Sequence, residues 1–387
     1  MHRRLLLLLL ALSVVGYVRA GDLPDGLYAE FDTPRGSFTA ELYYRQTPLT
    51  CGSFVGLAEG TIAAHDGQPF FHGLRWYRVV PGFVLQSGDP TNPGGGIQDR
   101  PKRTPADEAA GHPYTFPDEI VPGLHHDAAG VLSMANDGAD TNSSEFFITL
   151  AAVTRLNYLH SVFGRVVRGL EVLPQVRQDD ACSIRIRRVG AEAQAFAADE
   201  AALRARIAAA RRYAGPPAPG PAAFFDDPDQ VLPQDVPRAR NFNFQLANFE
   251  RFTGRRVYGR VYAHFTPRHP GQKLAEFNAE LARELHVDPE GVVVSYYADL
   301  DTWMIWIGEK WLGRFMGRTG SREEFVETGE LMRRKEAFLA AARERAATVI
   351  ARTRAEGRQV DHAQEIKVNL DEVLDAFILL YESKTTP

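Results

Sequence analysis

Short runs of alternating apolar and polar residues, interrupted by Gly, Pro and Asp, fill the chain from residue 26 to residue 190. Successive side chains of a strand point to opposite faces, so this alternation is typical of half-buried β-strands. Two segments of this part have a helical pattern, residues 49–59 and a turn near residues 154–159. Many short strands with little helix between them favour an antiparallel sheet that closes into a barrel.

One cation lies within an otherwise apolar run of this region. Arg78 is the central residue of the segment WYRVV, residues 76–80, which a Pro-Gly pair follows. As a strand, this segment places Arg78 on the same face as Trp76 and Val80. Taken alone, such an Arg is an edge residue whose stem covers apolar surface while its head reaches water.

Later sequence blocks change this interpretation of Arg78. They are GVLSMAN at 130–136, DTNSSEFFIT at 140–149 and LNYLHSVFGRV at 156–166, with FTAEL at 38–42, TPLTCGSF at 47–54 and SIRI at 183–186 around them. In this order and spacing the blocks resemble the cyclophilin family of peptidyl-prolyl cis-trans isomerases, over residues 26–190. The resemblance implies a mainly β domain, a closed eight-stranded antiparallel barrel capped by two helices.

The chemistry of such an isomerase suits an arginine. Rotation about an Xaa-Pro amide crosses a barrier of about 18–20 kcal/mol, because the nitrogen lone pair is delocalised into the carbonyl. A catalyst needs a dry pocket for the proline ring and a donor that favours the twisted amide, but no nucleophile, metal or cofactor. A guanidinium remains charged and offers several fixed donors, which burial strengthens. The resemblance gives this role to Arg78, with Gln86 holding the guanidinium in place.

The same resemblance implies the residues that contact the substrate, a proline-containing polypeptide. The residues expected to line the proline pocket are Phe83, Val84, Phe147 and Leu156, with His160 at its edge. Ala135 and Asn136 are expected to meet the residue preceding proline, mainly through their main chain. Taken singly, Phe147 or Leu156 is more simply a core residue, and only the collective pattern assigns them to a pocket.

Three residues depart from the family pattern. Val84 stands where the family usually has Met, which leaves an apolar but looser pocket. Arg155 stands where a Trp or His is frequent, so we expect weak cyclosporin binding. Glu145 occupies a substrate-binding position that usually holds Gln, and an ionised Glu only accepts hydrogen bonds. Glu145 therefore either pairs with Arg78 and restrains it, or points to solvent. The first possibility keeps open a non-catalytic scaffold that holds proline segments while the C-terminal region carries the function.

The first twenty residues predict a secretory signal peptide. A basic start precedes the apolar run of residues 5–15, and VRA at 18–20 offers a small-residue cleavage site before Gly21. The apolar run is short for a membrane span. We therefore expect an exported protein, periplasmic or extracellular, with no stable membrane insertion after cleavage.

Charge and cysteine content limit the classes of partner. Cleavage after residue 20 removes three of the 44 Lys and Arg and none of the 49 acids, which leaves a net charge of −8. This argues against a nucleic-acid partner. The two cysteines, Cys51 and Cys182, either form a disulfide in an oxidising compartment or are separate small buried residues.

The remainder of the chain indicates a linker and a second domain. Residues 191–240 read as an exposed helix followed by a Pro-rich linker, and residues 241–387 as an α/β domain of unknown function. The segments expected to be strands are 256–265, 291–297 and 302–308, and those expected to be helices are 271–285, 322–357 and 370–382. Acids near His264 and His269 follow no known metal-ligand spacing, so we expect structural or surface roles and no metal. The sequence does not indicate an oligomeric state.

Overall fold

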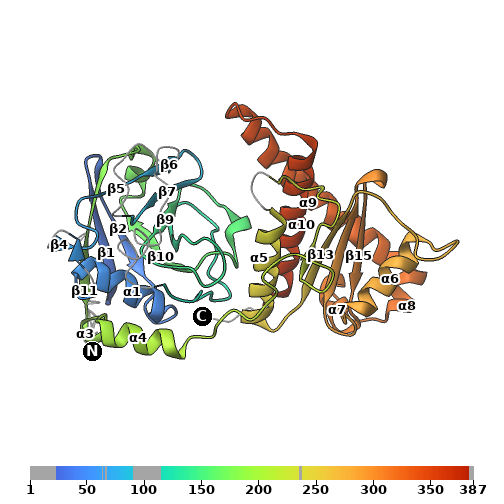
Figure 1. Ribbon diagram of the computed structural model, residues 1–387, viewed down its shortest axis with the longest axis horizontal. Coiled ribbons are helices and arrows are strands. Elements are labelled where there is room, and N and C mark those ends of the chain that lie inside the picture. Colours follow the sequence, from blue (N-terminus) through green and yellow to red (C-terminus); the bar gives the residue numbers. More distant parts are fainter. Residues whose placement is uncertain (1–22, 63, 66–67, 90–114, 235–237, 383–387) are drawn as a thin grey trace, which may run out of the picture.

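The computed structural model describes residues 23–62, 64–65, 68–89, 115–234 and 238–382. The expected signal peptide, residues 1–20, lies outside these ranges. Figure 1 shows two bodies side by side, an N-terminal one built on curled strands and a C-terminal one of helices and strands. Within the described part of the chain, no helix combines the length and the apolar composition that crossing a membrane requires.

The N-terminal body is an antiparallel sheet of nine strands in the order β5-β11-β1-β2-β10-β8-β9-β7-β6. The strands are β1 Gly26–Thr33, β2 Gly36–Leu42, β5 Leu74–Arg75, β6 Arg78–Val80, β7 Val84–Ser87, β8 Val131–Met134, β9 Phe146–Thr149, β10 Val162–Arg168 and β11 Ala181–Val189. The end strands β5 and β6 are separated in the chain only by Trp76 and Tyr77. They act as two halves of one interrupted strand, because β5 pairs with β11 and β6 with β7. The expected barrel class is confirmed, and the interruption explains nine strands in place of eight.

The same interruption corrects the expected orientation of Trp76. The Tyr77 amide donates to the carbonyl of Arg75 at 2.9 Å, so the chain turns here and does not continue as a regular strand. Trp76 is fully buried in the barrel core, with its ring 5.8 Å from that of Phe146. Arg78 instead lines a cavity outside this core. The expectation that Trp76 and Arg78 share a face was therefore wrong.

Helix α1 (Pro48–Glu59) packs into the barrel, as expected for residues 49–59. Its Phe54 ring lies 5.3 Å from that of Phe146 in the core. The carboxylate of Glu119 accepts hydrogen bonds from the amides of Leu49 at 3.0 Å and Thr50 at 2.7 Å. An anion at the positive end of a helix stabilises that end. The smaller elements are β3 Ala64–His65, β4 Gln68–Pro69, η1 Thr154–Leu156 and η2 Leu170–Gln175.

The helical part of the expected linker packs on the barrel and is not wholly exposed. It forms two short helices, α3 (Ala191–Ala195) and α4 (Glu200–Ala209). Ala193 and Leu203 are buried within the barrel core cluster. Burial of this small apolar set outweighs the polar composition that suggested exposure, since each buried side chain of Leu size contributes roughly 1.5–3 kcal/mol.

Both cysteines are buried and unbridged. The Cys51 thiol lies 3.6 Å from the carbonyl oxygen of Phe163. Burial raises the pKa of both thiols above the ordinary value. Of the two alternatives for Cys51 and Cys182, the structure shows two separate buried thiols and no disulfide between them.

The C-terminal body contains a four-stranded sheet in the order β12-β13-β14-β15. The strands are β12 Phe225–Asp226, β13 Val257–Tyr262, β14 Val292–Tyr297 and β15 Thr302–Ile307. The first three run parallel and β15 pairs antiparallel with β14. The three strands expected from the sequence are present, and the α/β class is confirmed.

Helices cover both faces of this sheet. They are α5 Arg238–Thr253, α6 Leu274–Glu284, η3 Ala298–Leu300, α7 Glu309–Met316, α8 Arg322–Glu327, α9 Glu330–Ala355 and α10 His362–Tyr381. On one face α6 packs in a cluster with Tyr258, Val293 and Tyr297. On the other face α5 and α10 share a second cluster with Val257 and Val292. The sequence prediction missed α5 and α7, and α5 begins inside the range assigned to the linker.

Polar residues of α5 join the two bodies. Gln245 donates to the carbonyl of Asn157 at 3.1 Å, and Asn248 donates to the carbonyl of Tyr158 at 3.0 Å. Arg251 forms an ion pair with Asp140 at 2.8 Å. Because Asn157 and Tyr158 lie between Leu156 and His160 in the chain, α5 crosses the barrel beside the expected substrate site.

Candidate active site

The register of the sheet aligns four residues in one row. Arg78 pairs with Gln86, Gln86 with Phe147, and Phe147 with Ser133, across the neighbouring strands β6, β7, β9 and β8. Directly opposed residues of an antiparallel sheet share a face. The sheet therefore places the expected donor Arg78 next to Gln86 and two strands away from Phe147.

Arg78 is half-buried and hydrogen-bonded to Gln86. Its Nη1 donates to Oε1 of Gln86 at 3.0 Å, and its guanidinium carbon lies 5.5 Å from the centre of the Phe83 ring. Burial lowers the pKa of Arg78, and the phenol of Tyr77 opposes this shift. Within the described ranges, Arg78 forms no ion pair. The contact expected between Gln86 and Arg78 is thus present, with the cation itself unpaired.

Glu145 takes neither of the two positions expected for it. Its Oε2 accepts hydrogen bonds from Nε2 of Gln86 at 3.0 Å and from the hydroxyl of Tyr77. The residue is 9% exposed, so it is not directed into solvent. Gln86 lies between Arg78 and Glu145, with its oxygen toward the donor and its nitrogen toward the acceptor. Glu145 therefore orients the amide that holds Arg78 and forms no ion pair with Arg78.

A cavity of about 260 Å³ lies beside Arg78, and several of the predicted substrate-binding residues line it. Phe83, Leu156 and His160 line it together with Arg78. Phe147 and Val84 are buried, 4% and 2% exposed, and do not line this cavity. The Phe147 ring supports the cavity indirectly, because it meets the His160 ring edge-on at 5.3 Å.

His160 is held in one orientation by the backbone. Its Nδ1 lies 3.0 Å from the carbonyl oxygen of Met134, and a carbonyl can only accept, so Nδ1 carries the proton. Burial, together with the nearby cations Arg155 and Arg78, lowers the pKa of His160 to about 4. His160 is therefore neutral near pH 7.

A second histidine, His126, lies behind Phe147 and was not predicted to take part in the site. Its ring stacks on that of Phe147 at 5.6 Å, and its nitrogens contact Ser133 Oγ at 2.9 Å and Asn157 Oδ1 at 3.1 Å. Burial and the nearby His160 lower the pKa of His126 to about 3. The sequence did not indicate a role for His126 in the site, because the residues that its ring contacts, Phe147 and Asn157, are distant from it in the chain.

Ala135 and Asn136 lie at the other side of His160. The Ala135 amide donates to the carbonyl of Glu145 at 2.9 Å, and the Asn136 side chain donates to the carbonyl of Leu159 at 2.9 Å. A separate cavity of about 340 Å³ is lined by Asn136, Leu159 and His160. Asn136 thus borders this cavity, whereas the amide of Ala135 is already bound to the carbonyl of Glu145.

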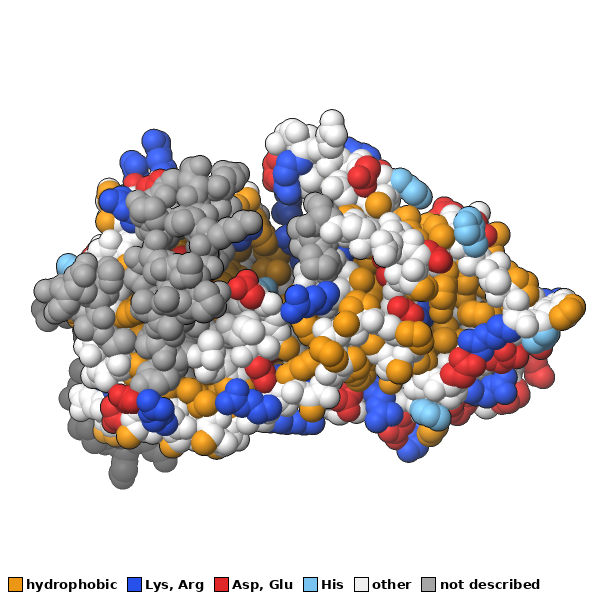
Figure 2. All heavy atoms as spheres, in the orientation of Figure 1, with side chains coloured by type: hydrophobic (Ala, Val, Ile, Leu, Met, Phe, Trp, Pro, Cys, Tyr) orange, Lys and Arg blue, Asp and Glu red, His pale blue; other side chains and the backbone are white. Residues whose placement is uncertain are grey.

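The opposite wall of the 260 Å³ cavity comes from the C-terminal body, which the sequence did not indicate. Residues of α5 and α10 line it: Arg238, Asn241, Phe242, Gln245, Lys367 and Asp371. Arg155 completes this wall from the barrel, with its guanidinium carbon 4.6 Å above the Phe83 ring. Burial lowers the pKa of Arg155. Figure 2 shows the hollow between the two bodies, with Lys and Arg side chains along it.

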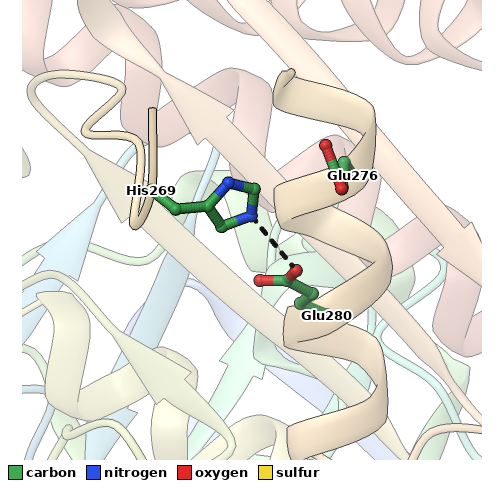
Figure 3. A group of neighbouring side chains, drawn as sticks. All are labelled: His269, Glu276 and Glu280. Atoms are coloured by element: carbon green, nitrogen blue, oxygen red, sulfur yellow. Dashed lines mark ion pairs between the residues drawn. The ribbon is translucent and has the colours of Figure 1, made fainter. Parts of the chain in front are cut away.

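A group of possible metal ligands lies far from this site, on and near α6. His269, Glu276 and Glu280 bring ligand atoms within 4.8 Å of one another, and His269 faces Glu280 at 3.7 Å (Figure 3). The Glu280 carboxylate already accepts a hydrogen bond from Gln272 at 2.8 Å and lies 3.6 Å from Arg268. Because His269 and Glu276 are exposed, ordinary surface ion pairing accounts for the group.

Known proteins match the part of the chain that forms the barrel. A family model described as cyclophilin type peptidyl-prolyl cis-trans isomerase matches residues 28–191. The peptidyl-prolyl cis-trans isomerase-like 1 of Aspergillus fumigatus is 41% identical over 146 residues, which are 38% of this chain and 79% of that protein. The peptidyl-prolyl cis-trans isomerase ppi1 of Schizosaccharomyces pombe is 42% identical over 143 residues, 37% of this chain and 80% of that protein.

Among solved structures, a cyclophilin type isomerase of Cryptosporidium parvum covers 42% of this chain and 97% of its own, at 28% identity and a TM-score of 0.33. The same protein was crystallised in the presence of the dipeptide Ala-Pro, and that structure has a TM-score of 0.32 to this chain at 27% identity, covering 42% of this chain and 99% of its own. The family match ends at residue 191, so the C-terminal body lies beyond it. Through its barrel, this chain belongs to the cyclophilin-type peptidyl-prolyl cis-trans isomerases.

Proposed function

We propose that this chain is an exported isomerase that rotates Xaa-Pro bonds in proteins folding outside the cytoplasm, with Arg78 as the catalytic donor. The observation that carries the proposal is the state of Arg78 at the cavity. The guanidinium is half-buried, fixed by Gln86 at 3.0 Å and unpaired with any described carboxylate. A donor of this kind is available to the substrate without first breaking an ion pair.

The residues around the cavity have different roles in this proposal. The proline ring enters the cavity bordered by Phe83, Leu156 and His160. The guanidinium of Arg78 donates to the twisted amide, where the nitrogen lone pair is no longer delocalised. Such a donor stabilises the transition state more than the planar ground state, and low local polarity increases its effect. Neutral His160 adds no positive charge that would compete with Arg78 for the substrate.

The substrate class follows from the same cavity. Proline-containing polypeptides fit a site in which the apolar side chains of Phe83 and Leu156 lie beside the donor Arg78. The dipeptide Ala-Pro, in whose presence the Cryptosporidium parvum relative was crystallised, also contains an Xaa-Pro bond. Export is supported by the basic and apolar pattern of residues 1–20.

Refolding of a protein whose slow phase is limited by a prolyl bond tests the catalytic part. The chain from Gly21 to Pro387 should accelerate that phase, and Arg78→Ala should not. Capture of the unfolded protein by both forms, without acceleration by either, would instead favour the non-catalytic scaffold. Cell fractionation with mass analysis of the N-terminus tests export, and a protein that retains residues 1–20 in the cytoplasm would contradict it.

A further inference from the structure

The wall that the C-terminal body adds to the site is strongly cationic. A cavity of about 370 Å³ extends from Arg78 and Phe83 to the turn between α9 and α10. Its charged lining consists of Arg78, Arg155, Arg238, Arg352, Arg358 and Lys367, against only two acids, Glu356 and Asp371. This excess of four positive charges occurs in a chain whose net charge is −5. We call this cavity the interdomain groove.

The two acids of the groove pair with Arg358 and Lys367 and leave its four other cations without an acidic partner among the described residues. Glu356 pairs with Arg358, and Asp371 pairs with Lys367. Arg155, Arg238 and Arg352 form no ion pair within the described part of the chain, and neither does Arg78. Burial is the main cause that lowers the pKa of Arg155; the like charges of Arg238 and Arg352 lower it further, whereas Asp371 and Asp375 raise it. Asp375 is a buried residue of α10 that accepts a hydrogen bond from Gln245 at 3.1 Å, and it does not line the groove.

Unpaired like charges that converge in a cleft create a field that attracts anions. The groove shares Arg78, Phe83 and Arg155 with the 260 Å³ cavity, so the two form one continuous surface. A polypeptide with its proline in the cavity therefore continues into the groove. Carboxylate side chains are the anionic groups that such a polypeptide carries.

The position of Asn136 indicates in which direction the substrate chain runs through the site. Asn136 borders the separate 340 Å³ cavity beyond His160, on the side assigned to the residue preceding proline. The groove adjoins the 260 Å³ cavity at Arg78 and Phe83 and shares no lining residue with the 340 Å³ cavity, which adjoins the 260 Å³ cavity at His160. We infer that the interdomain groove binds acidic residues that follow the proline, so that the C-terminal body makes the enzyme selective for prolines with Asp or Glu on their carboxyl-terminal side. This inference deepens the proposed isomerase function and rests on it.

The test compares peptides that differ only in charge. Exchange spectroscopy on the chain from Gly21 to Pro387 measures kcat/KM for Ala-Ala-Pro-Ala-Glu-Glu, for the same peptide with Gln-Gln, and for Glu-Glu-Ala-Ala-Pro-Ala. We expect the Glu-Glu tail after proline to raise kcat/KM about tenfold over Gln-Gln, which corresponds to about 1.4 kcal/mol. The advantage should shrink with rising salt. Glu residues before proline should give no advantage.

Matched variants locate the effect. Arg238→Gln with Arg352→Gln should bring the Glu-to-Gln ratio close to one. Arg343→Gln is the control, because Arg343 lies on α9 as Arg352 does but faces a different cavity. Equal rates for Glu and Gln tails, an equal advantage for Glu before proline, or a preference that survives the double substitution would overturn the inference.

Calorimetric binding of the same peptides separates this inference from the proposed function. Preferential binding of the Glu tail by a chain that isomerises neither peptide would support the groove and contradict only the isomerase proposal. The salt dependence of the unmodified chain provides the same information if the double variant does not fold.

Discussion

The side-chain oxygen of Gln86 accepts a hydrogen bond from Arg78 at 3.0 Å, while the nitrogen of the same amide donates to Glu145 at 3.0 Å. An amide can satisfy both neighbours only in this orientation, since Arg has no acceptor and an ionised Glu has no donor. Glu145 is therefore compatible with an active Arg78. The acid fixes the amide that fixes the guanidinium.

Glu145→Gln should leave activity within about threefold of the parent, because the carbonyl of Gln can accept the same hydrogen bond from Gln86. Glu145→Leu removes the acceptor that the Gln86 nitrogen and the Tyr77 hydroxyl share, and loss of a buried hydrogen-bond acceptor typically costs about 1–3 kcal/mol. Isomerisation of an Ala-Pro peptide by both variants gives the comparison. A tenfold gain in Glu145→Gln would mean that the acid restrains Arg78 after all.

Gln86→Leu should lower kcat/KM by roughly ten- to a hundredfold, because the guanidinium loses its fixed orientation while its charge remains. The fold should be retained, since Gln86 is only half-buried. The pH profile of the variant should keep its shape, because no titrating group is removed. A normal rate in Gln86→Leu would show that Arg78 is positioned by other contacts.

Acidification should destabilise the barrel through its two buried histidines. The pKa of His160 falls to about 4 and that of His126 to about 3, from an ordinary value of 6.5. The folded state prefers the neutral rings. Their contribution to the free energy of unfolding is therefore complete above pH 6.5, and it is lost as the pH falls toward 4 for His160 and toward 3 for His126. At pH 5 each histidine lowers the free energy of unfolding by about 2 kcal/mol relative to neutral pH. Urea unfolding of His126→Gln should show a shallower loss between pH 7.5 and 5 than the parent, and an equal slope would contradict the assignment.

Asp375 should act in the opposite direction at the interface of the two bodies. Burial, with the nearby Asp371, raises the pKa of Asp375 from 3.8 to about 7. The folded state prefers the protonated acid. The contribution of Asp375 to the free energy of unfolding is therefore complete below pH 3.8 and is lost as the pH rises to 7. Asp375→Asn can still accept the hydrogen bond from Gln245 and carries no charge. The substitution should therefore stabilise the protein at pH 8, by at most about 4 kcal/mol.

The control for Asp375→Asn is its behaviour on acidification. Denaturant unfolding should show that the gain at pH 8 vanishes near pH 4, where the parent acid is itself protonated. Glu372→Gln is a neighbouring α10 substitution in an ion pair with the exposed Arg345, and it should give no such pH-dependent gain. A destabilised Asp375→Asn at pH 8 would indicate that the charge of Asp375 is needed at the interface.

The barrel half of the site could be predicted because its residues recur as short ordered blocks. Arg78, Phe83, Leu156 and His160 were identified this way and line one cavity, and Gln86 was identified as the partner of Arg78. The face of Trp76 was predicted wrongly, since strict alternation assumes a continuous strand and the chain turns at Tyr77. The order of residues in the chain does not show such a turn.

The C-terminal wall could not be predicted from local pattern. Helix α5 uses Gln245 and Asn248 for hydrogen bonds to the barrel, and these polar residues weaken the amphipathic signal of a helix. Arg155 was noted only as a departure from the family, because its neighbours Arg238 and Lys367 are distant in sequence. Long-range packing, and not local preference, decides these contacts.

The most direct test of the account is the rate at which the chain isomerises an Ala-Pro peptide before and after Arg78→Ala. Line-shape analysis of the cis and trans signals measures this rate, with circular dichroism to verify the fold and Arg75→Ala as the control for loss of an exposed arginine nearby. Loss of a donor to the transition state predicts a decrease of about a hundredfold or more in Arg78→Ala, and little change in Arg75→Ala. An unchanged rate in a folded Arg78→Ala would contradict the role of Arg78 and with it the mechanism.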